Sequence, residues 1–178
     1  MAAIVSMLRG VNLGKRRIKM DALRNLYESL GLQDPRTYVQ SGNVVFGCKD
    51  RSLEKVAKRI EAAIEKQFGF QSDTILRTAA EMKDVVQRNP FAKRDDVHPG
   101  KLLVMFLDRD PGPEAGKKIA AITDVPEELY LDGRELYIYF PNGQARPTLK
   151  MTLVDKALNA RWTGRNWNTV LALLEMAE

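Results

Sequence analysis

Six residues near the N-terminus have the side chains and spacing of an anion-binding loop. They are Arg9, Asn12, Gly14, Lys15, Arg16 and Arg17. Glycine lets backbone N–H groups approach a phosphate closely, while guanidinium and ammonium groups supply positive charge. The loop lacks the Gly-Lys-Ser/Thr ending that holds magnesium and nucleotide phosphates in a P-loop. These residues therefore predict either a site for an anion or a structural turn with solvated basic side chains.

A second group of polar side chains lies near the C-terminus and includes Arg146, Lys150, Arg165 and Asn166. Arg165 is the strongest candidate for binding, because a guanidinium can hold an oxyanion with two parallel hydrogen bonds. Asn166 precedes an apolar helical stripe, so it is also well placed to cap a helix. We keep both interpretations, anion contact and helix capping, for this group.

Two further polar or aromatic patterns have a structural and a functional interpretation. Ser41 and Asn43 flank Gly42 and could add hydrogen bonds to a ligand, although a tight turn alone explains this triplet. Tyr137 and Tyr139 point to one face of a predicted strand, beside Tyr130. Nucleic-acid bases could stack on such a face, but ordinary sheet packing also favours tyrosine.

Residues for nucleophilic or zinc chemistry are scarce. The chain has one cysteine, Cys48, and one histidine, His98, too few for a zinc site built on sulfur and imidazole. Cys48 has no basic neighbour before Lys49, so nothing indicates an activated thiolate. We therefore predict no catalytic residue, no cofactor and no metal, although a metal held only by carboxylates stays open.

Composition indicates a globular protein with an uneven charge distribution. Of its 178 residues, 44% are apolar and 29% charged, which suits a chain that can bury a core. The formal net charge is +5, yet residues 9–24 alone carry +5 and residues 144–168 carry +4, so the remainder is acidic. Clustered Lys and Arg favour an anionic partner, such as a small molecule or nucleic acid, over a neutral one.

Cysteine usage and hydropathy bear on location. A single cysteine cannot form an internal disulfide, and no apolar run approaches the ~20 residues that span a bilayer. We expect a cytoplasmic protein that is not integral to a membrane.

Hydrophobic periodicity and turn residues predict the same order of elements twice. In the first half we expect strands at residues 2–8, 36–40, 43–46 and 73–77, with helices starting near Met20, Ser52 and Thr78. The second half has predicted strands at residues 101–107, 129–131 and 135–140, a short extended piece at 161–163, and helices at 113–122, near 152–158 and from Trp167.

This order predicts an α+β fold of two tandem ferredoxin-like subdomains, each β-α-β-β-α-β plus a helix with an antiparallel sheet. We place the subdomains at residues 1–90 and 100–178, joined by a linker at residues 91–99. Right-handed crossovers then require the strand order 4-1-3-2. Because both central strands are continuously apolar, we expect their second faces to be covered, either within the chain or in a homodimer.

The same topology predicts which loops meet. In the first subdomain residues 9–19 and the hairpin at 40–43 share one edge of the sheet. In the second subdomain residues 142–150 and residues 165–168 share the opposite edge. The two basic stretches would thus lie on exposed rims.

Four segments together resemble the bacterial domain-of-unknown-function family 1697. They are Leu8–Gly14 (LRGVNLG), Thr37–Phe46 (TYVQSGNVVF), Asn89–Phe91 (NPF) and Arg165–Val170 (RNWNTV). The resemblance implies a tandem ferredoxin-like fold in a bacterial cytoplasmic protein, and it implies no reaction.

The residues leave three classes of function open. The leading hypothesis is binding of a phosphorylated metabolite, a nucleotide or nucleic acid at a basic loop edge. A metal-independent enzyme acting on a phosphorylated or carboxylated substrate is the second, and a structural or assembly protein is the third. The chain could act as a monomer or a homodimer.

Overall fold

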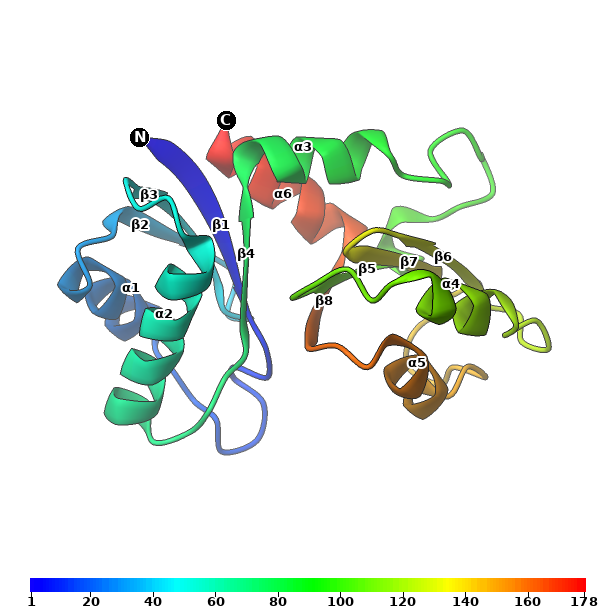
Figure 1. The fold of residues 1–178 in the computed structure, drawn as a ribbon, viewed down its shortest axis with the longest axis horizontal. Helices are drawn as coiled ribbons and strands as arrows, with labels where there is room; N and C mark the ends of the chain where they lie inside the picture. The colour runs from blue at the N-terminus through cyan, green and yellow to red at the C-terminus, as the bar shows by residue number, and fades with distance from the viewer. The chain divides into compact units, whose positions relative to one another are not determined.

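We describe the fold from a computed structural model that covers residues 1–178. The chain is α+β and divides into two compact units. Unit 1 consists of Met1–Asp84 together with Leu171–Glu178, and unit 2 of Val85–Val170. Figure 1 shows the helices and strands of each unit. No helix combines the length and the apolar character needed to cross a membrane.

Unit 1 is built on a four-stranded antiparallel sheet in the order β2-β3-β1-β4. This is the strand order 4-1-3-2 that the sequence predicts. Its elements are β1 (Ala2–Leu8), α1 (Met20–Ser29), β2 (Gln33–Tyr38), β3 (Asn43–Cys48), α2 (Leu53–Phe68), β4 (Thr74–Thr78) and most of α3 (Ala79–Gln87).

The core of unit 1 lies between its sheet and helices α1 and α2. Ile4 and Leu8 of β1 point into this core, where Tyr27 of α1 and Phe46 of β3 meet with their rings 5.4 Å apart. The alternate residues Val5 and Met7 are buried as well. Both faces of β1 are therefore covered, as its continuous apolar sequence predicts.

Unit 2 repeats the arrangement with the strand order β6-β7-β5-β8. Its elements are β5 (Leu102–Leu107), preceded by a 3₁₀ turn (Pro99–Lys101), α4 (Pro113–Ala120), β6 (Glu128–Asp132), β7 (Glu135–Tyr139), α5 (Met151–Leu158) and β8 (Trp162–Asn166). The last helix, α6 (Trp167–Ala177), starts in unit 2 and ends among the residues of unit 1.

Of the tyrosines that the sequence offers as a stacking platform, Tyr137 and Tyr139 are buried in unit 2, whereas Tyr130 is 51% exposed. The Tyr137 hydroxyl donates to the Val85 carbonyl over 2.7 Å, and the Tyr139 hydroxyl donates to the Asp96 carbonyl over 3.2 Å. The Phe91 ring lies 6.0 Å from that of Tyr139. The segment before β5 thus covers Tyr137 and Tyr139 and keeps bases from stacking on these two rings.

Two strands differ from the prediction. β2 runs over Gln33–Tyr38 instead of 36–40, and it tolerates Pro35 because it is an edge strand with a register shift there. The last strand is longer than the predicted 161–163, because Gly164 lies opposite Met105 and leaves room for the Leu103 side chain. Arg165 and Asn166 consequently belong to β8.

The predicted helix caps are present. Thr78 and Glu81 form a reciprocal capping box, in which each side chain accepts the backbone N–H of the other over 2.8 and 3.1 Å. Ser52 accepts the N–H of Lys55 at the start of α2. The amide oxygen of Asn166 accepts the N–H of Thr169, which caps α6.

Candidate functional site

The loop after β1 is anchored at both ends and turns tightly between them. The apolar side chains of Val11 and Ile18 are buried in the core. Between them the backbone bonds of Asn12 and Arg16 close a short turn, whose N···O distances are 2.6 Å (Asn12 N to Arg16 O) and 3.0 Å (Arg16 N to Leu13 O). Gly14 stands at the tip with φ of 56°, in the left-handed region that suits glycine.

Asn12 joins this loop to the β2-β3 hairpin. Its amide nitrogen donates to the Gln40 carbonyl over 2.5 Å, and its amide oxygen accepts the N–H of Ile18 over 3.0 Å. The backbone N–H of Leu8 also donates to the carbonyl of Gly42 over 2.9 Å. The loop and the hairpin therefore share one edge of the sheet, as predicted.

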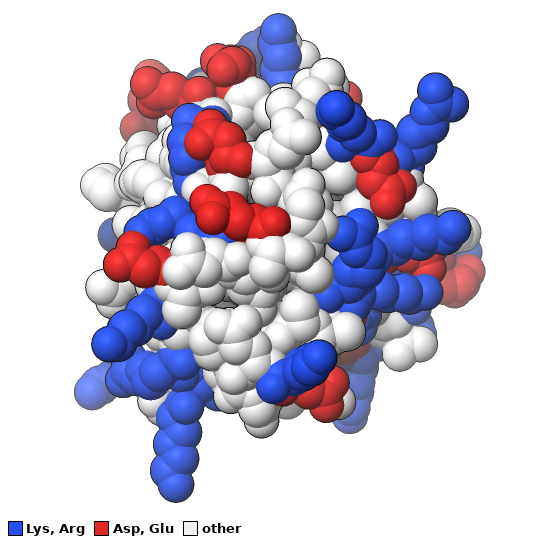
Figure 2. Space-filling view, turned by 90° about the vertical axis from the view of Figure 1, so that its left-hand side faces the viewer, with Lys and Arg blue, Asp and Glu red and all other residues white.

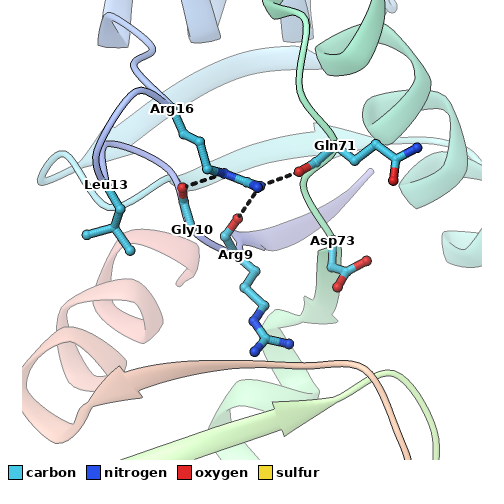
Figure 3. A pocket seen from close by; sticks show the side chains of 6 residues that line it. All are labelled: Arg9, Gly10, Leu13, Arg16, Gln71 and Asp73. Atoms are coloured by element: carbon cyan, nitrogen blue, oxygen red, sulfur yellow. Dashed lines mark hydrogen bonds between the residues drawn. The ribbon is translucent and has the colours of Figure 1, made fainter.

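Arg16 crosses from this loop to the segment that precedes β4 (Figure 3). Its guanidinium donates to the carbonyls of Gly10, over 3.0 Å, and of Arg9 and Gln71. The same group lies over the Phe70 ring, 4.8 Å from its centroid. A planar guanidinium offers several fixed donors, so one side chain can bridge two loops. Arg16 therefore holds the loop after β1 and the segment before β4 together, with its positive charge between them.

Arg9 and Asp73 are neighbours across β1 and β4. The register pairs Leu8 with Thr74, so the next pair outward is Arg9 with Asp73, and the N–H of Arg9 donates to the carbonyl of Asp73 over 2.9 Å. Since Leu8 points into the helix-covered core, Arg9 and Asp73 point to the other face of the sheet. Figure 3 shows both side chains extending to the same side of Arg16.

These residues line a cavity of about 370 Å³. Its walls come from the end of β1, the following loop and the segment before β4: Arg9, Gly10, Leu13, Arg16, Gln71 and Asp73. The volume is in the range of small-molecule sites. Two guanidinium groups and one carboxylate give the lining a net positive charge, and Leu13 adds an apolar side chain that is 67% exposed.

The six residues predicted to form the anion site thus have different positions in the loop. Arg9 and Arg16 line the cavity, whereas Asn12 shapes the loop. Lys15 and Arg17 are exposed at the turn, and one nitrogen of Arg17 donates to the carbonyl of Asn12 over 3.3 Å. Gly14 lies at the exposed tip.

Ser41 and Asn43 serve the hairpin. The Asn43 side chain is fully buried and donates to the Tyr38 carbonyl over 3.0 Å and to the Ser41 hydroxyl over 2.8 Å. Neither residue lines the cavity.

The structure disperses the second basic group. Arg165 is only 7% exposed, pairs with Val104 in the ladder, and donates to Thr163 Oγ1 and the Gly164 carbonyl, each over 2.8 Å. Burial lowers its pKa to about 10. Asn166 caps α6, while Arg146 and Lys150 are exposed in the loop before α5. Arg165 therefore lies on the face of the sheet, away from the rim where the sequence suggested it.

Sequence reasoning missed Gln71 and Asp73. The signal was available, because the order 4-1-3-2 makes β4 the neighbour of β1 and brings the segment before β4 to the end of β1. The prediction considered only the hairpin on the other side of β1. All four strands in fact reach this edge of the sheet, through the end of β1, the β2-β3 hairpin and the start of β4.

The side chains that most often bind metals, and the single thiol, have the following positions. No group of three or more His, Cys, Asp and Glu side chains is placed to hold a metal ion. Cys48 is 7% exposed and faces the core of unit 1. Charge on the face drawn in Figure 2 is mixed, with Lys and Arg in several groups and Asp and Glu between them. On that face the basic side chains do not form one continuous surface.

Comparison with known proteins places the chain in a family. Residues 1–137 match the family described as "Protein of unknown function (DUF1697)". The chain belongs to this family. A solved structure, that of a conserved bacterial protein from Streptococcus pneumoniae, is similar to this DUF1697 member with a TM-score of 0.75 and 20% sequence identity. The similarity covers 99% of this chain and 98% of that one, and it shows the fold alone. No curated protein matches the chain.

Proposed function

We propose that this DUF1697 protein binds a small anionic molecule in the cavity at the end of β1, with Arg9 as the main contact. The observation that carries the proposal is the lining itself, in which Arg9 and Arg16 both border a cavity of about 370 Å³. A guanidinium at the wall of a small cavity suits a phosphate or carboxylate, because it offers two parallel hydrogen bonds as well as charge.

The contacts of Arg16 support a site that exists before the ligand arrives. Its bonds to the carbonyls of Gly10, Arg9 and Gln71 hold the walls in place. Less conformational entropy is then lost on binding, which favours affinity. The exposed Lys15 and Arg17 raise the local positive potential and would speed the approach of an anion at low ionic strength.

A small molecule fits the observations better than nucleic acid does. The cavity has the volume of a metabolite site, and Tyr137 and Tyr139, two of the tyrosines that could have stacked bases, are buried under the segment before β5. Binding would therefore centre on the Arg9 cavity in unit 1.

Three broader proposals accompany this one. We assign each unit to the ferredoxin-like class, because both combine the β-α-β-β-α-β order with the same antiparallel strand order. We place the two sequence repeats at residues 1–90 and 100–178 with a linker at 91–99; these differ from the compact units, because Leu171–Glu178 at the end of the second repeat belongs to unit 1. The buried single cysteine is in keeping with a cytoplasmic location.

The proposal is tested by isothermal titration calorimetry with inorganic phosphate, AMP and a short oligonucleotide, at low and high salt. We expect at least one small anion to bind, and Arg9→Ala to weaken that binding about tenfold or more, since a charged hydrogen-bonded pair is lost. Arg51→Ala, which removes an exposed arginine elsewhere in unit 1, is the matched control. Equal affinities in the two variants would contradict the proposal.

A further inference from the structure

We propose that a groove between α1 and α2 in unit 1 binds a small carboxylate with an apolar tail, and that Lys66 holds the carboxylate group. The groove shares no lining residue with the Arg9 cavity, so this inference does not depend on the proposed function. It assigns the protein a second class of ligand, short aliphatic carboxylates.

The groove is a cavity of about 640 Å³ along the line where the two helices meet. Both helices pack on the same face of the sheet of unit 1, and they lie next to each other in Figure 1. At the end of α1, Leu26 and Leu30 form one wall, and Ala62 and Ala63 of α2 form the other. The alanine side chains are short, so the helices do not close the space between them. The volume is in the range of small-molecule sites.

The charged groups that line this groove are basic. They are Arg59 and Lys66, which are seven positions apart on α2 and therefore about 10 Å apart along its axis. Arg59 already has partners, because its guanidinium donates to the carbonyl of Leu30 and lies 3.8 Å from the Asp50 carboxylate. It therefore fixes the wall of the groove and does not receive the ligand.

The charge of Lys66, in contrast, is available to a ligand. Lys66 is exposed in the last turn of α2, and its ammonium group has no hydrogen bond or ion pair within the chain. Its aliphatic stem can lie on the apolar wall while the ammonium group reaches the ligand. No carboxylate lines the groove to compete for this charge.

These features specify the ligand by its two ends. A carboxylate next to Lys66 gains a charge-assisted hydrogen bond, and an alkyl tail that runs toward Arg59 covers Leu26 and Leu30. Because an exposed ion pair contributes little, most of the affinity comes from burial of the tail. Lys66 then determines which sign of charge the groove accepts.

The experiment is an NMR titration of the full chain at low ionic strength with butanoate, hexanoate, octanoate and octylammonium. We expect the affinity of the carboxylates to rise about two- to fourfold with each added methylene, because each one is buried in the groove. The amide shifts should be confined to the end of α1 and to residues 59–67.

Two lysine variants test the recognition of the carboxylate. Lys66→Gln should weaken octanoate about threefold and leave octylammonium no weaker, because only the anion loses its partner. Lys55→Gln is the matched control, since Lys55 is an exposed lysine on the same helix that does not line the groove. Equal octanoate affinities of these two variants would refute the role of Lys66.

A third variant tests the groove without changing its charge. Ala62→Leu places a larger side chain between the helices and keeps a residue that favours a helix. Octanoate should then bind about tenfold more weakly, because its tail is no longer buried. Amide shifts spread over the whole surface, or equal octanoate affinities of Ala62→Leu and wild type, would overturn the site. The melting temperature of each unliganded variant checks its folding.

Discussion

Asn12 shows how much the shape of the loop after β1 can depend on one side chain that does not line the cavity. It adopts φ of 60°, a left-handed conformation in which asparagine is tolerated and most residues are not. Its amide fixes both the hairpin and the residues that lead into α1 through the bonds to Gln40 and Ile18. The cavity walls on either side of Arg16 depend on this geometry.

Replacing Asn12 tests that dependence. Asn12→Ala should lower the free energy of unfolding by about 2–3 kcal/mol, because two hydrogen bonds are lost and alanine is strained at this φ. Asn12→Gly loses the same bonds without the strain, so it should cost about 1 kcal/mol less. Urea unfolding of both variants gives the difference, and equal losses would show that the backbone conformation contributes nothing.

Val39 is a second residue in the left-handed region, with φ of 48° and 54% of its surface exposed. A β-branched residue is a poor fit there. Val39→Asn should raise the free energy of unfolding by about 0.5–1 kcal/mol, because asparagine adopts this conformation more readily. Leu13→Asn is the control, since it makes an exposed apolar side chain polar outside a left-handed position. A gain in both variants would point to a general surface effect.

Among the elements, the segment before β5 (residues 88–98) is held against β6 and β7 by two arginines. Each of them forms ion pairs with two carboxylates. Arg88 contacts Asp132 over 2.6 Å and Glu135 over 2.9 Å. Arg94 contacts Asp96 over 2.6 Å and Glu128 over 2.7 Å, while its guanidinium lies over the Phe91 ring. These contacts keep Tyr137 and Tyr139 covered, so they decide which face of the sheet is accessible.

The ion pair between Arg94 and Asp96 makes the stability of this segment depend on pH. The hydrogen bond from Arg94 lowers the pKa of the Asp96 carboxyl below its usual value. Because the folded pKa is the lower one, this pair stabilises the protein above the unfolded pKa of about 4, and the stabilisation is lost as the pH falls through the folded pKa. Asp96→Asn should therefore be less stable than wild type at pH 6, and the difference should shrink as the pH falls below about 4.

Urea unfolding at several pH values measures that difference. Asp95→Asn, a change at the exposed neighbouring carboxylate, is the matched control. If Asp96→Asn keeps the same deficit at every pH, the ion pair does not contribute as stated.

At the scale of the whole molecule, unit 1 contains both ends of the chain. Residues Leu171–Glu178 belong to it although unit 2 lies between them and Asp84 in the sequence. The carbonyl of Met176 accepts a hydrogen bond from Arg36 of β2 over 2.6 Å, and Leu173 is fully buried. The folding of unit 1 should therefore require the complete chain.

Deletion of residues 171–178 should destabilise unit 1 by about 3 kcal/mol or more, since buried apolar side chains are removed from it. Hydrogen exchange gives the test, because amides of β1 and β3 should lose protection although they lie more than a hundred residues from the deletion. Removal of Glu178 alone, which is exposed, is the control. Unchanged protection in β1 and β3 would contradict the prediction.

Local pattern is sufficient for the order of the elements and for the position of the basic loop after β1. The capping box at Thr78, the cap at Asn166 and the apolar stretch of β1 depend on residues close in sequence, so they can be read without coordinates. The contact between the loop after β1 and the β2-β3 hairpin can also be predicted, because the connectivity and the handedness of the crossovers require it.

Only the tertiary structure decided which side chains share a cavity. Arg9 and Asp73 are 64 positions apart and become neighbours through the pairing of β1 with β4, whose register is set by packing of the whole sheet. In the same way Arg165, an attractive ligand residue by type, is buried because β8 extends through Gly164. Residue type limits what a side chain can do, but burial and long-range pairing determine which groups it meets.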